Sequence, residues 1–156
     1  MERRAFIALL GGAAAAMPSP VNAGPSQSER HGGARISGTW SFVSSVDTRK
    51  DGSIFNRWGD DARGALMIDS RGHYSLIIMG SESRMFGAKT FCSFGTYAFD
   101  EPKKLFITQI EASSISRLVG ITQTRHIASL TAVELVYVNP VTSAGTQAEV
   151  KWKRLG

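Results

Sequence analysis

The stretch ISGTWSFVSS, residues 36–45, decides the fold because its side chains alternate between the two faces of an extended chain. Trp40, Phe42 and Val46 fall on one face, and Ser45 falls on the other. We expect the Trp40 face to point inward, since large apolar side chains favour the protein core. The stretch therefore predicts a β-strand with a buried tryptophan near its start.

The same alternation continues to the end of the chain, and no window of 11 or more residues keeps a helical stripe. Glycine-containing turns and short loops separate the alternating segments and favour antiparallel neighbours. An open sheet of this size would leave its edges and one apolar face exposed. We therefore predict an all-β fold, a closed antiparallel up-and-down β-barrel of eight to nine strands. The expected strands are 38–47, 53–58, 64–69, 73–79, 91–99, 104–112, 119–129, 132–138 and 146–154.

The chain has 156 residues, of which 42% are hydrophobic and 20% charged, and this suits one compact domain. We place that domain at residues 36–156. The longest break between expected strands is Gly80 to Lys89, for which we expect a lid or a short helix across one mouth of the barrel.

Residues 1–23 have the features of an export signal. A basic start precedes an apolar stretch that is too short for a transmembrane helix, and Ala23 ends a small-residue segment. Arg3-Arg4-Ala5-Phe6 resembles the core of a twin-arginine signal. We expect a protein that is exported in bacteria to the periplasm or secreted, without a stable membrane anchor.

Residues 24–35 are rich in glycine, serine and charged side chains, which predicts a disordered tether. The net charge of +5 is scattered along the chain without a basic stripe, so we expect no nucleic-acid partner. Cys92 is the single cysteine, and an intrachain disulfide is therefore impossible.

Gly38-Thr39-Trp40 resembles the G-x-W start of calycin barrels, the lipocalins and fatty-acid-binding proteins. In those families the tryptophan plugs one end of the barrel, and a basic residue near the end of the last strand often packs over it. The resemblance implies that Trp40 is the floor of the barrel. It also implies that Arg154 or Lys153 covers its ring through a cation–π contact.

A longer resemblance runs from Ile36 to Leu155. The segments GTWSFVSSVDTRKDGSIFNRWGDDARGALMIDSRGHYSLIIM, FGTYAFDE, VGITQTRHI and VKWKRL are similar to the bacterial and fungal lipocalin-like domain family. The segment Gly80 to Lys89 departs from that family, which often has a longer loop with a helix there. The family is mostly of unassigned function, so the resemblance implies a fold and a tendency to bind ligands.

The sequence offers no set of residues for catalysis or metal binding. Cys92 is expected on the face opposite Tyr97, and His126 on an outward face. Neither His31 nor His73 has ligand spacing to another histidine or to the cysteine. We therefore expect no catalytic residue, no metal and no cofactor.

The strand that contains Gln123 and Arg125 is the exception to apolar alternation, since Ile121 and Ile127 share its face with these polar residues. If that face is inner, Arg125 is either held in a structural network, by carbonyls or Glu111, or it binds the polar end of a ligand. A carboxylate, phenolate or carbonyl would suit it. The candidate ligand-binding residues are Trp40, Phe42, Leu66, Tyr74, Tyr97, Phe99, Gln123 and Arg125, with Leu76 and Leu105 as further apolar wall.

These observations predict a protein that binds a small, hydrophobic or amphipathic molecule inside the barrel and has no chemistry of its own. One alternative is an isomerase or cyclase that folds a hydrophobic substrate in the cavity beside Arg125. Another is a filled barrel that serves as an interaction module of the cell envelope, which the absence of a cavity of about 300 Å³ would favour.

Overall fold

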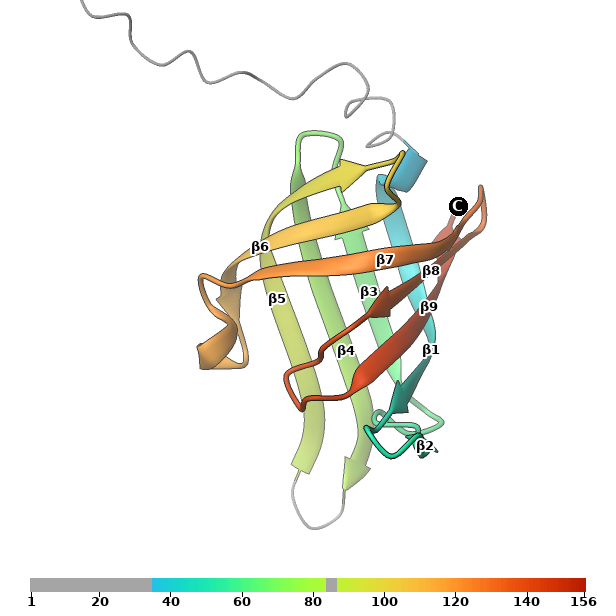
Figure 1. Cartoon of the computed structure of the whole chain (residues 1–156), viewed down its shortest axis with the longest axis vertical. Helices are drawn as coiled ribbons and strands as arrows, with labels where there is room; N and C mark the ends of the chain where they lie inside the picture. Colours follow the sequence, from blue (N-terminus) through green and yellow to red (C-terminus); the bar gives the residue numbers. More distant parts are fainter. Residues whose placement is uncertain (1–34, 84–86) are drawn as a thin grey trace, which may run out of the picture.

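The computed structural model describes residues 35–83 and 87–156, and it is an all-β structure (Figure 1). The expected export signal, and the expected tether apart from Arg35, lie outside the described residues. Nine strands and one 3-10 turn are present in the described part of the chain: β1 (Gly38–Thr48), β2 (Ile54–Phe55), β3 (Arg63–Ile68), β4 (His73–Ser83), β5 (Gly87–Asp100), β6 (Leu105–Ser113), η1 (Ser116–Leu118), β7 (Thr122–Leu130), β8 (Glu134–Asn139) and β9 (Gln147–Leu155).

The strands form one antiparallel sheet that closes on itself. Strands β3 to β9 follow each other in chain order, and β1 pairs with both β3 and β9. The short strand β2 adds to the end of β1, outside this circle of eight. The predicted closed up-and-down barrel is therefore confirmed, and closure leaves none of the eight strands with a fully unpaired edge.

Trp40 seals one end of the barrel. It is completely buried, and its indole N–H donates to the carbonyl oxygen of Ile36 at 2.9 Å. The guanidinium of Arg154 lies 3.9 Å from the centre of the Trp40 ring. Arg154 also donates to the carbonyl oxygens of Ala132, Ser37 and Arg35, at 2.8, 2.6 and 2.7 Å. The expected tryptophan floor and its basic cover are both present, with Arg154 as the cover.

Gly38 is required by this arrangement. Its φ of +132° is rarely adopted by other residues, and a Cβ atom at this position would lie 2.5 Å from Nη1 of Arg154. The absence of a side chain at Gly38 thus leaves room for the guanidinium that covers Trp40.

A β-bulge in β1 corrects the expected facing of its second half. The register with β9 shifts between Phe42 and Ser44, so one extra residue is accommodated and the alternation is reversed beyond it. Val46, expected inside, is 42% exposed. Ser45, expected outside, is buried, as is Asp47. The bulge therefore turns a carboxylate into the barrel.

The segment from Gly80 to Lys89 was expected to break the sheet, but the described residues continue it. Strand β4 runs to Ser83 and β5 begins at Gly87, and Glu82 lies opposite Ala88 beyond a register shift that follows Met79. The ends of β4 and β5 extend past the neighbouring strands in Figure 1. The expected second strand is also much shorter than predicted, since only Ile54–Phe55 pairs with β1.

Two predicted outward side chains are confirmed, since Cys92 and His126 are both exposed. Ile121, expected to share the face of Arg125, lies just before β7 and is 45% exposed. In the described ranges, no helix is long and apolar enough to cross a membrane.

The seal at Trp40 gives the first testable expectation. Replacing Arg154 with methionine removes the cation–π contact and three hydrogen bonds to backbone carbonyls, so Arg154→Met should lower the free energy of unfolding by about 2 to 3 kcal/mol. The adjacent Lys153 is exposed, and Lys153→Met should change it by less than about 0.5 kcal/mol. Urea denaturation measures both, and equal effects of the two substitutions would contradict the role assigned to Arg154.

Candidate functional site

The end of the barrel opposite Trp40 holds a cavity of about 360 Å³. Buried side chains of β4, β8 and β9 form much of its wall, and η1 and the loop after β2 border it. Apolar groups predominate in this wall, chiefly Leu76, Ile78, Phe91, Leu118, Tyr137 and Val150. The volume lies within the range of about 300 to 1,000 Å³ that is typical of small-molecule sites. The barrel is therefore not filled, which disfavours the interaction-module alternative.

One side of the cavity carries a compact ion-pair network. Asp47 is 1% exposed, and its Oδ2 accepts hydrogen bonds from Nε and Nη2 of Arg57 at 2.9 and 2.7 Å. The hydroxyl of Thr146 donates to the same oxygen at 2.7 Å. Ser45 lies near the other carboxylate oxygen, at 3.4 Å. The negative charge of Asp47 is thus compensated, and the loop that contains Arg57 is tied to β1.

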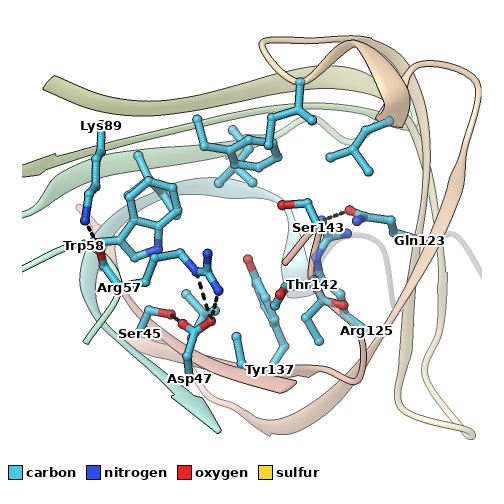
Figure 2. A pocket seen from close by; sticks show the side chains of 18 of the residues that line it. Ser45, Asp47, Arg57, Trp58, Lys89, Gln123, Arg125, Tyr137, Thr142 and Ser143 are labelled. Carbon is cyan, nitrogen blue, oxygen red and sulfur yellow. Dashed lines mark hydrogen bonds and ion pairs between the residues drawn. The ribbon is translucent and has the colours of Figure 1, made fainter. Parts of the chain in front are cut away.

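Arg125 lies on the other side of the cavity, with Tyr137 between it and the ion pair (Figure 2). It is 3% exposed. Its Nη1 donates to the hydroxyl of Thr108 at 2.7 Å, and its Nη2 donates to Oε1 of Gln123 at 2.8 Å. The expected inward orientation of Arg125 and Gln123 is confirmed. Glu111, considered as a partner from the sequence, is exposed, and neutral oxygens take its place.

Aromatic rings surround the Arg125 guanidinium. Its central carbon lies 5.4 Å from the ring centre of Tyr137 and 5.8 Å from that of Phe106, which are cation–π distances. Burial raises the pKa of the Tyr137 hydroxyl, although the positive charge of Arg125 and the nearby N–H groups of Trp152 and Arg125 oppose the shift. Tyr137 is therefore protonated at neutral pH and can donate a hydrogen bond.

Three loops of the described residues border the mouth of the cavity. Trp58, in the loop between β2 and β3, is half-buried, and Nζ of Lys89 donates to the carbonyl oxygen of Arg57 beside it at 3.3 Å. Across the mouth, Arg117 in η1 donates to the carbonyl oxygen of Ser143 at 2.5 Å. This bond connects the β6–β7 segment to the β8–β9 loop, and Ile115 and Thr142 of these two segments line the cavity.

The sequence-predicted site residues divide into two groups. Gln123 and Arg125 line the cavity, as does Leu76. The remaining seven do not line it: Trp40, Phe42, Leu66, Tyr74, Tyr97, Phe99 and Leu105. All of these except Leu105 pack in or against the hydrophobic core. Tyr97 donates its hydroxyl proton to the carbonyl oxygen of Asp69 at 2.7 Å, and burial, with a smaller effect of the Asp69 charge, raises its pKa to about 12.

Asp47, Arg57, Trp58 and Tyr137 were not predicted from the sequence as cavity residues. Asp47 escaped because strict alternation, without the bulge, places it on the outer face of β1. Arg57 and Trp58 come from a segment that was expected to be a strand and is mostly loop. The one available signal was an aspartate near the end of a strand otherwise free of charge.

Groups for catalysis or metal binding do not gather at this site. The residues described around the cavity include no histidine or cysteine. Within residues 35–83 and 87–156, no three histidine, cysteine, aspartate or glutamate side chains are placed to hold a metal ion. What the arrangement can do is enclose an apolar molecule and offer hydrogen-bond donors to one end of it.

No family model and no curated protein matches the chain. Among solved structures, it is similar to a de novo designed fluorescence-activating β-barrel, with 16% identity, a TM-score of 0.45, and coverage of 79% of this chain and 96% of that one. It is also similar to bovine odorant-binding protein in complex with a selenium-containing odorant (16% identity, TM-score 0.46, 80% and 73% coverage). A third is the siderocalin Ex-FABP (7% identity, TM-score 0.39, 78% and 71% coverage). The barrel itself is defined by the strand pairings described above.

The ion-pair network leads to the second expectation. Asp47→Asn removes the buried charge that compensates Arg57, so it should lower the free energy of unfolding by about 2 to 4 kcal/mol, since one partner of a buried pair is lost. Asp61→Asn, in an exposed turn, makes the same chemical change and should cost less than about 0.5 kcal/mol. Thermal and urea unfolding of both variants test this, and an Asp47→Asn protein as stable as Asp61→Asn would refute the assignment.

Proposed function

We propose that this protein binds a small, mostly apolar molecule in the cavity at the open end of its barrel. The observation that carries the proposal is the cavity of about 360 Å³, which has apolar walls and a buried guanidinium on one side. Sites of this kind obtain affinity from apolar burial, at about 25 cal/mol per Å², and orientation from a few polar groups. Gln123, Arg125 and Tyr137 would supply that orientation.

Binding without turnover fits the chemistry around the cavity better than an enzymatic role. A nucleophilic mechanism needs a nucleophile, a base and an orienting group within reach of each other. The exposed side chains of Cys92 and His126 point away from the cavity, and the buried Asp47 is already held by Arg57 and Thr146. The polar groups that remain are suited to hold a ligand.

We further propose that the protein acts outside the cytoplasm, in the periplasm or as a secreted protein. Support comes from the sequence of residues 1–23, with its paired arginines, weakly apolar stretch and small-residue end. A barrel with a single cysteine needs no disulfide to fold, which suits export in the folded state.

The binding proposal predicts saturable uptake of a neutral apolar fluorophore such as N-phenyl-1-naphthylamine, at one molecule per chain. Ala148 is buried and faces the cavity, so Ala148→Phe should fill the space and weaken binding at least tenfold. Ala98 is exposed on β5, and Ala98→Phe should leave the affinity unchanged. Fluorescence titration measures all three. Absence of saturable binding by the original protein, or unaltered binding by Ala148→Phe, would overturn the proposal.

The export proposal predicts that the full chain, expressed in a bacterial host, yields a periplasmic product that starts after Ala23. Replacing Arg3 and Arg4 with lysines should leave the precursor in the cytoplasm if the twin-arginine route is used. Cell fractionation with mass spectrometry of the intact product measures both. A product that retains residues 1–23 in the cytoplasm would refute the proposal.

A further inference from the structure

The two arginines of the cavity differ in how their charge is compensated. Arg57 forms a 2.7 Å ion pair with Asp47, which carries the opposite charge. Arg125 has no such partner, since no carboxylate of a described residue lies within ion-pair distance of it. A side chain that is 3% exposed therefore brings an uncompensated positive charge to the cavity wall. Buried charges are ordinarily paired, so this one requires an explanation.

The hydrogen bonds of Arg125 satisfy only part of its guanidinium. The group has five N–H donors, and within the described residues two of them make hydrogen bonds of good geometry, to Thr108 and Gln123. These two acceptors are neutral oxygens, and the nearby hydroxyl of Tyr137 is neutral as well. The aromatic rings of Phe106 and Tyr137 attract the guanidinium but carry no net negative charge. The immediate surroundings thus hold the guanidinium in place without neutralising it.

The other polar groups near Arg125, the hydroxyl of Tyr137 and the indole of Trp152, carry no negative charge. Tyr137 is protonated, and its side chain lies between Arg125 and the ion pair in Figure 2. The indole N–H of the fully buried Trp152, whose ring centre is 6.4 Å from that of Tyr137, makes no hydrogen bond of good geometry to a described residue. This side of the cavity therefore presents the positive charge of Arg125 and the hydroxyl of Tyr137, which can donate a hydrogen bond.

We propose that the natural ligand is an amphipathic monoanion, whose oxyanion head group binds Arg125 while its apolar body lies against Leu76, Ile78 and Val150. This inference rests on the proposed function and specifies the class of ligand. An oxyanion supplies the missing negative charge and accepts from the planar guanidinium, which is well matched to such groups. A neutral carbonyl or hydroxyl compound would satisfy hydrogen bonds but leave the charge uncompensated.

The charge of the ligand can be isolated with two fluorophores that share one skeleton. 8-Anilino-1-naphthalenesulfonate is N-phenyl-1-naphthylamine with an added sulfonate, so the pair differs by a single oxyanion. We expect the original protein to bind the sulfonate at least tenfold more tightly than the neutral compound. Arg125→Met should abolish this preference while it retains the neutral fluorophore within about threefold. Arg125→Lys, which keeps the charge, should retain a preference for the anion.

Two controls locate the effect. Arg71→Met removes an exposed cation from the turn between β3 and β4 and should leave the preference intact, which excludes a general attraction to a basic protein. Ala148→Phe should weaken binding of the sulfonate as well as of the neutral compound, which places both in the cavity. Circular dichroism of each variant confirms that it is folded.

The outcomes separate this inference from the proposed function. If the original protein binds both fluorophores equally, or if folded Arg125→Met weakens both by the same factor, the ligand is not selected by charge and the inference is overturned while cavity binding stands. If neither compound binds, the proposed function is refuted, and the inference that rests on it is refuted with it. If Arg125→Met does not fold, the ratio of the two affinities in the original protein decides whether the anion is preferred. The same preference is then measured for a carboxylate, by comparing how well dodecanoate and dodecanol displace the bound fluorophore.

Discussion

Pairing of the first strand with the last is the constraint on which everything else depends. Strand β1 is bonded to β9 along nearly its whole length, from Thr39 opposite Leu155 to Thr48 opposite Gln147. This contact converts a meander into a barrel and so creates an interior with a sealed end and an open end. The seal comes from the same two strands, since Trp40 belongs to β1 and Arg154 to β9. The pairing of β1 with β9 thus both closes the barrel and brings Arg154 over Trp40 at its sealed end.

The interior that results has two polar regions with different energetic character. Asp47 and Arg57 compensate each other, and the hydroxyl of Thr146 completes the network, so the loss of either charged partner would destabilise the folded chain. Arg125 is positioned by Thr108 and Gln123 without being neutralised. Natural proteins tolerate such an unfavourable group where function requires it, and this contrast between two arginines in one cavity separates the structural cluster from the one that we propose to bind the ligand.

Alternation and turn chemistry were sufficient to predict the barrel, its approximate strands and the inward orientation of Arg125. The tryptophan seal followed from the resemblance in Gly38-Thr39-Trp40. The face of Asp47 could not be predicted from alternation, because the bulge is a property of the pairing between β1 and β9, and the only local hint was the lone charge of Asp47 itself. Most of the apolar side chains predicted to line the cavity point inward but lie in the packed part of the barrel. An alternating pattern identifies which side chains point inward, but it does not tell at which height along the axis the barrel is packed and where it is hollow.

The three tryptophans differ in their exposure to solvent, so their fluorescence can be distinguished. Trp40 and Trp152 are completely shielded from solvent, whereas Trp58 is half-buried where the cavity meets the outside. A water-soluble collisional quencher should therefore reach one indole and spare the other two. The quenched emission then comes from Trp58, and the emission that persists comes from Trp40 and Trp152. Trp58 is therefore an intrinsic fluorophore at the mouth of the cavity, and a change in its emission would report a molecule bound there without any attached dye.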